Sequence, residues 1–140
     1  MGKGGIIEDG RHPAPLKVEN DRGSAVVDFV LIGALLTLFF MSIVQLTLVL
    51  HVRNTLVDAA ASGARYGALS DRTPLDARSR TAELIGAALN VDFARDVTST
   101  EITSDGNRTL EVTVKAPLPV VGLIGPAKLL EVKGHADLPG

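Results

Sequence analysis

The sequence predicts an α+β chain. A long N-terminal helix that crosses a membrane over about residues 29–50 continues into a small domain with one shorter helix and a three-stranded antiparallel sheet. Residues 29–50 contain no charged side chain. A helix-start signal precedes the amphipathic stretch 74–89. After that stretch the apolar residues recur at every second position, which is the period of a half-buried strand.

The uncharged run is long enough to span a membrane. Its 22 residues would extend about 33 Å as an α-helix, against a hydrocarbon core of about 30 Å. A chain of 140 residues could hardly surround such a helix on all sides, which disfavours the buried core helix of a soluble protein. A secretory signal has an apolar region of about 7 to 15 residues before a small-x-small site, whereas this longer run ends in VLHVRN.

The segment before the span is polar and rich in glycine. Its basic and acidic side chains balance, and Pro13 and Pro15 push the residues before them toward extended geometry. We expect residues 1–23 to form a disordered tail. Basic residues flank both ends of the span, so their count alone does not decide which end lies in the cytoplasm.

The helix is expected to continue beyond the membrane, so that it covers residues 24–69. Residues 51–69 contain no proline, and small or apolar side chains recur there at helical spacing. These side chains are Leu56, Val57, Ala60, Ala61, Ala64 and Ala68. A G-x-x-x-G pair in this stretch lies outside the apolar run, where its interpretation as a membrane dimer motif is weak. The residues assigned to helix packing are Ala60, Gly63, Ala64, Arg65 and Gly67.

Residues 70–140 are expected to form the small α+β domain. Thr73 is a good N-cap, Pro74 suits the first helical position, and Asp76 completes the spacing of a capping box. The helix that this signal predicts runs from about residue 74 to residue 89.

Three strands should follow that helix. Residues 109–115 alternate between polar and apolar, residues 97–103 are rich in threonine and β-branched side chains, and Asp105-Gly106 between them is a hairpin signal. Residues 130–138 alternate again, after a short apolar loop over 120–125. We expect an antiparallel sheet whose apolar face is covered by the helix at 74–89.

The sequence offers no constellation for catalysis. It has no cysteine, which excludes disulfides, thiolate metal ligands and a cysteine nucleophile, and its net charge of −2 does not favour a nucleic-acid partner. His12, His51 and His135 lack metal-ligand spacing, and Asp92 and Asp96 lie in a polar connector without a predicted pocket. We expect no catalytic residue, no metal and no cofactor, and a chain that is not an enzyme.

One short motif resembles a known family. The sequence RGSAVVDF at 22–29, followed by the apolar helix, resembles the processing and assembly motif of type IV pilin-like proteins. The sequence AAASGARYGA at 59–68, which we name the small-residue segment, resembles the A-x-x-G-A-R-x-G/A stretch of one branch. This branch is the TadE-like minor pilins, or pseudopilins, of tight-adherence (Tad) type IV pilus systems.

The resemblance implies a processed chain. In these proteins a membrane-embedded prepilin peptidase cuts after the leader glycine, so the implied junction lies between Gly23 and Ser24. Asp28 then takes the fifth mature position, which is usually glutamate in the family. A free α-amine at the start of an apolar helix needs a counter-charge, and a carboxylate on a neighbouring helix can supply it.

The resemblance also implies orientation and partners. The peptidase acts at the cytoplasmic face, so residues 1–23 form a cytoplasmic leader and residues 70–140 an external domain. The implied protein is a single-pass subunit of the cytoplasmic membrane that takes part in assembly of a Tad-type pilus or a related secretion apparatus. Its implied partners are the membrane, the prepilin peptidase, other pilins or pseudopilins and the assembly platform.

Two other interpretations stay open at this point. One is an unprocessed, signal-anchored membrane protein whose external domain binds a partner. The other is a membrane-anchored enzyme, which the lack of paired catalytic residues disfavours.

Overall fold

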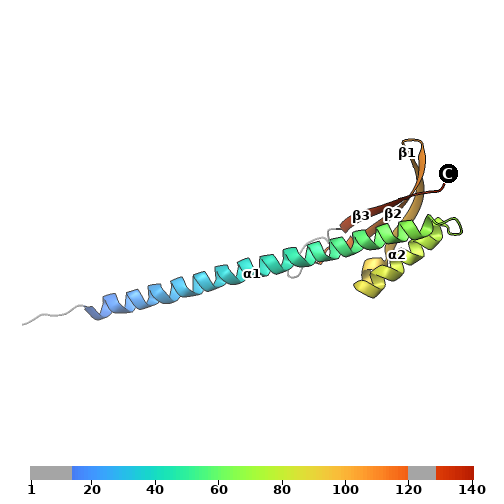
Figure 1. The fold of residues 1–140 in the computed structure, drawn as a ribbon. Helices are drawn as coiled ribbons and strands as arrows, with labels where there is room; N and C mark the ends of the chain where they lie inside the picture. The colour runs from blue at the N-terminus through green and yellow to red at the C-terminus, as the bar shows by residue number, and fades with distance from the viewer. Residues whose placement is uncertain (1–13, 120–128) are drawn as a thin grey trace, which may run out of the picture. The chain divides into compact units, whose positions relative to one another are not determined.

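The computed structural model describes residues 14–119 and 129–140 (Figure 1). The chain divides into two compact units, Met1–Ile43 and Val44–Gly140. Helix α1 (Ala14–Gly67) begins in the first unit and ends in the second. The second unit also holds α2 (Pro74–Ala88), the short 3-10 helix η1 (Val91–Ala94) and three strands. The predicted α+β class, with a long apolar N-terminal helix, one further helix and a three-stranded antiparallel sheet, is confirmed.

Both ends of α1 differ from the prediction. The helix begins at Ala14, so the disordered tail predicted for residues 14–23 is wrong; residues 1–13 lie outside the described part of the chain. Pro15 falls in the first helical turn, where a missing N–H breaks no intrahelical hydrogen bond. The helix ends at Gly67 rather than at residue 69, because glycine is the weakest helix former after proline.

The apolar part of α1 within the first unit packs against no other described element. Every residue from 20 to 43 is exposed, and 78% of the surface of Phe29 is accessible to solvent. The hydroxyls of Thr37 and Ser42 donate to the carbonyl oxygens four residues earlier, at 2.8 Å each. Thr37 and Ser42 carry the only hydroxyls between residues 25 and 43, and both hydroxyls therefore bond within the helix. A hydrocarbon surrounding requires this, because it offers no hydrogen-bond partner of its own.

Helix α2 starts where its capping box predicts. The Thr73 hydroxyl oxygen accepts from the Asp76 N–H at 3.3 Å, and Asp76 Oδ2 accepts from the Thr73 N–H at 2.8 Å. The helix ends at Ala88, one residue earlier than predicted. Asn90 then caps η1 through its side-chain oxygen, a short helix that the sequence did not indicate.

The sheet has the order β1-β2-β3, with both pairs antiparallel. Its strands are β1 (Asp96–Ser104), β2 (Asn107–Pro117) and β3 (Leu129–Asp137). Asp105 and Gly106 form the β1–β2 turn with φ angles of 52° and 85°, which is the left-handed geometry that this dipeptide favours. All three predicted strands are confirmed, within two residues at each end, and the loop predicted at 120–125 lies outside the described residues.

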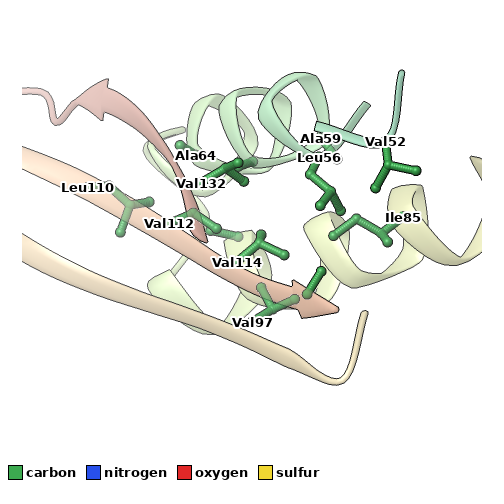
Figure 2. Close-up of a cluster of buried hydrophobic side chains, with 13 residues drawn as sticks. Val52, Leu56, Ala59, Ala64, Ile85, Val97, Leu110, Val112, Val114 and Val132 are labelled. Carbon is green, nitrogen blue, oxygen red and sulfur yellow. The ribbon is translucent and has the colours of Figure 1, made fainter. Parts of the chain in front are cut away.

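The core of the second unit lies between this sheet and two helices (Figure 2). Leu110, Val112 and Val114 on β2 are fully buried, as are Ile85 of α2 and Leu56 of α1. The prediction assigned the cover of the sheet to the second helix alone, which is incomplete. Three strands are about 10 to 14 Å wide and one helix covers about 10 Å, so the last turns of α1 are needed as well.

Candidate functional site

The implied processing junction lies inside a helix. Gly23 and Ser24 are exposed positions of α1, and a Cβ at Gly23 would meet nothing within 4 Å. A peptidase could therefore approach this junction, but its cleft takes an extended backbone. Cleavage at this position would require the helix to open locally, and glycine lowers the cost of opening by about 1 kcal/mol relative to alanine.

Asp28 stands one helical turn after Ser24. It is exposed, and it forms no hydrogen bond or ion pair with another residue of the described chain. The separation of four positions places it on the same face of α1 as the Ser24 nitrogen. In the intact chain this nitrogen is a peptide N–H and carries no charge.

The helix that carries the junction is long and apolar enough to cross a membrane. The candidate span is Asn20–Gly67, and its most apolar 18-residue window has no buried residue. The core helix of a soluble domain would be mostly buried in that window. The exposed apolar surface of α1 instead requires an apolar surrounding from outside the described chain.

The glycines of the small-residue segment pack inside the domain. A Cβ at Gly63 would overlap the Thr81 hydroxyl and lie 2.9 Å from the Ala77 carbonyl oxygen. A Cβ at Gly67 would overlap Ala77 and lie 2.9 Å from a methyl group of Leu110. The G-x-x-x-G pair thus lets α1 and α2 approach closely within one chain.

Ala60 of the same segment packs against the sheet. Ala60 and Ala64 are fully buried, and the Ala60 backbone lies directly against Gly134 of β3. Sequence reasoning did not single out Gly134. A lone glycine within an alternating strand was the available signal, because it often marks a close backbone approach.

Arg65 is the exception among the residues assigned to packing. It is exposed and lines an open depression of about 480 Å³. The other lining residues are Ala68, Leu69, His135, Ala136 and Asp137. The segment therefore presents its small residues to its own domain and its one charge to the surface.

The described residues contain no grouping typical of a catalytic or metal centre. Residues 14–119 and 129–140 hold no cluster of three potential metal ligands. Asp92 pairs with Arg95 at 2.6 Å, Asp96 begins β1 as an exposed residue, and His12 lies outside the described range.

His135 belongs to a small cluster on the polar face of the sheet. Its Nε2 lies 2.9 Å from Glu111 Oε2, and Lys133 Nζ lies 3.2 Å from Glu111 Oε1. The hydrogen bond with His135, together with Lys133, holds the pKa of Glu111 below its usual value against a smaller opposing effect of burial. The surface is open, so this cluster stabilises pairing of β2 with β3 rather than forming a pocket.

Comparison with known proteins finds a similarity to one protein family, over one part of the chain. Residues 23–65 match the family model described as TadE-like protein. No curated protein and no solved structure matches the chain significantly. The matched residues begin at the glycine of the junction and end at Arg65, so they include Asp28, the apolar run and most of the small-residue segment. Residues 23–65 are thus similar to the TadE-like family, as the resemblance predicted.

Proposed function

We propose that this chain is a pseudopilin-like minor pilin that is processed after Gly23 and takes part in assembly of a Tad-type pilus or a related secretion apparatus. The match to the TadE-like family supports a protein associated with a Tad pilus, and the candidate span supports a membrane protein. The proposed protein is structural rather than enzymatic, with residues 1–23 in the cytoplasm and residues 51–140 outside.

A single observation carries the proposal. The family match begins at Gly23, where the polar leader meets an apolar helix whose side chains are exposed. Such a helix can leave the membrane only by packing against other apolar helices, because its exposed surface cannot be hydrated without large cost. Packing into a bundle of pilin helices satisfies this requirement.

Asp28 has a defined role in this proposal. After cleavage the α-amine of Ser24 becomes a cation at the start of the apolar helix. Asp28 of a neighbouring subunit would pair with it in a surrounding of low dielectric, where the attraction is far stronger than in water. The partners are then the prepilin peptidase, other pilins or pseudopilins, and the assembly platform.

The test is the mass of the membrane-extracted protein in cells with and without a prepilin peptidase. We expect a mature chain that begins at Ser24 in the first case and the intact chain in the second. An intact chain in both cases would overturn the proposed processing.

A second candidate function is an unprocessed, signal-anchored membrane protein with an external partner-binding domain. The continuous helix from Ala14 through Gly23 favours it, because a helical backbone is a poor protease substrate. Hydrogen exchange of the amides of residues 20–26 discriminates between the candidates. Rapid exchange in the intact chain favours processing, and strong protection favours a permanent anchor.

A further inference from the structure

The second unit contains the last turns of the uncharged run of α1. The unit begins at Val44, and the run ends at Leu50. The 22 residues of the run extend about 33 Å along the helix, or about 31 Å across a membrane at the average tilt of about 20°. Because a hydrocarbon core is about 30 Å thick, Leu50 marks the boundary between hydrocarbon and headgroups. The levels of other residues of the second unit can therefore be measured along α1 from Leu50.

The core of the second unit begins at this boundary. Val52, two residues after Leu50, is 3% exposed and belongs to the buried cluster between the sheet and the helices. Val49, inside the uncharged run, is half-buried, whereas Val30 earlier in the run is exposed. Because both valines lie in the same helix, the difference comes from other parts of the second unit that cover Val49. The domain therefore reaches the level of the boundary and does not stand above it on a bare length of helix.

Strand β3 approaches the same boundary with its first residues. Gly134 lies directly against Ala60, and residues 135–137 line a depression together with Arg65, so β3 and α1 advance in the same direction. Leu129 precedes Gly134 by five residues, which is about 16 Å of strand or the rise of about eleven helical residues. Counted back from Ala60, this distance reaches the last turn of the uncharged run. Leu129 is exposed, so β3 presents a leucine side chain at the level of the boundary.

The segment that follows α2 presents a second apolar side chain close to this level. Ala88 lines an open depression of about 260 Å³ together with Thr55. Val91 of η1 folds back toward Gly86, so that a Cβ there would lie 3.8 Å from a Val91 methyl group, and Val91 is exposed. Thr55 stands about 7.5 Å past Leu50, and the headgroup layer is about 5 to 8 Å thick. Val91 therefore lies near the outer border of the headgroup layer.

The charges around these two side chains balance. The described cations at this end of the unit are matched in number by the described anions, and all of them are exposed. The cations are Arg53, Arg95 and Lys115, and the anions are Asp92, Asp96 and Glu131. Asp92 also pairs with Arg95 at 2.6 Å. A surface that combines balanced charges with exposed apolar side chains suits zwitterionic headgroups above an apolar interior, because it needs no anionic lipid to attract it.

We propose that the end of the second unit that carries Leu129 and Val91 is inserted into the headgroup layer of the membrane that α1 crosses, so that its partner is a lipid surface. Insertion removes both side chains from water, which is favourable in proportion to the apolar area that is buried. The short distance from Leu50 to the core at Val52 leaves no helix long enough to hold this end away from the lipid. The inference rests on the membrane span of the proposed function, and not on cleavage or on pilus assembly.

The absence of cysteine from the sequence allows a test with single-cysteine variants that carry a fluorophore. The full-length Leu129→Cys chain is placed at low density in phosphatidylcholine vesicles with brominated acyl chains, which quench fluorescence on contact. Leu75→Cys is the matched control, because Leu75 is 64% exposed against 65% for Leu129. Leu75 lies at the opposite end of the unit, since Ala77 packs against Gly67, about 25 Å past the boundary. We expect the lipid to quench the label at position 129 at least threefold more strongly than the label at position 75.

Two further measurements complete the test. Iodide in the aqueous phase should quench the label at position 75 at least twofold more strongly than the label at position 129. Leu36→Cys places the label on an exposed residue inside the candidate span, where brominated lipid should quench it strongly and iodide should not. Leu129 is exposed, so its replacement leaves the core of the second unit intact.

The outcomes separate this inference from the proposed function. Equal lipid quenching at positions 129 and 75, with strong quenching at position 36, would overturn the lipid contact alone. Protection of position 129 from iodide without quenching by lipid would assign this end to a protein partner and overturn the inference too. Absence of lipid quenching at position 36 would contradict the span, and with it both the inference and the proposed function. Strong lipid quenching at position 129 in an intact, uncleaved chain would support the inference whatever the fate of the junction at Gly23.

Discussion

Gly134 of β3 lies directly against Ala60 of α1, so that a Cβ at position 134 would overlap the Ala60 carbonyl group and the Ala61 nitrogen. Backbone atoms cannot turn aside as a side chain can. We therefore expect Gly134→Ala to lower the free energy of unfolding by about 1 to 3 kcal/mol, which is the usual cost of overpacking. Denaturant unfolding of the detergent-extracted chain, followed by circular dichroism, measures the change.

Gly33→Ala is the matched control for this substitution. A Cβ at Gly33 meets nothing within 4 Å, so the domain should unfold as the unmodified chain does. Unchanged unfolding of Gly134→Ala would show that α1 is not held against β3 as the structure has it.

The capping box of α2 provides a second prediction. Thr73→Ala removes the hydroxyl that accepts from the Asp76 N–H and leaves that N–H without its partner. We expect a loss of about 1 kcal/mol in the free energy of unfolding. Thr73→Ser keeps the hydroxyl and should retain most of the stability, so equal losses in the two variants would speak against a capping role.

A third prediction concerns the dependence of stability on pH. His135 and Lys133 hold the pKa of Glu111 below its usual value of 4.5 in the folded chain. The resulting stabilisation is fully present above about pH 4.5, the unfolded value, and is lost as the pH falls through the lower folded value. In Glu111→Gln this part of the pH dependence should disappear.

The measurement is the free energy of unfolding of both chains between pH 7 and pH 3. The difference between them should shrink in the acid range, as the pH falls below about 4.5. Thr100→Val, on the neighbouring strand of the same face, keeps the cluster and serves as the control. A difference that grows toward acid pH would mean that the pKa of Glu111 is not lowered.

The sequence predicts correctly those elements that depend on interactions between residues close together in the chain. Thr73 and Asp76 mark the start of α2 through bonds between residues three apart, and Asp105-Gly106 supplies the turn that joins β1 to β2. The implied junction at Gly23 and the role assigned to Asp28 also come from a contiguous motif, and both stay predictions. In each case the responsible interaction lies within a few positions in the chain.

The features that the prediction missed depend on interactions between residues that lie far apart in the sequence or on the rest of an element already formed. The prolines near the N-terminus were weighed as helix breakers, but a helix that already exists extends at low cost, because its nucleus is formed. Pro15 therefore sits inside α1, at its first turn. The cover of the sheet by α1 depends on the fit of Gly134 against Ala60, which only the folded chain brings together.

The last prediction concerns Asp28, for which the change Asp28→Asn should spare insertion and cleavage but impair assembly. Insertion tolerates the change because it removes a charge from an apolar helix, which lowers the transfer cost. Cleavage depends chiefly on Gly23, which is unchanged. Assembly would place the new α-amine of Ser24 in a helix bundle without its counter-charge, and an unpaired buried charge costs about 3 to 5 kcal/mol.

Asp28→Glu separates loss of charge from loss of shape. It keeps the carboxylate and adds one methylene, which restores the reach usual in the resembling family, so assembly should be retained or improved. Crosslinking of the three chains to pilus components, with the mature N-terminus of each verified by mass spectrometry, measures the effect. Because Asp28 pairs with no other residue of the described chain, the folded domain gives Asp28→Asn no other route to a defect. Equal assembly of Asp28→Asn and the unmodified chain would therefore mean that Asp28 is only a charge at the membrane boundary.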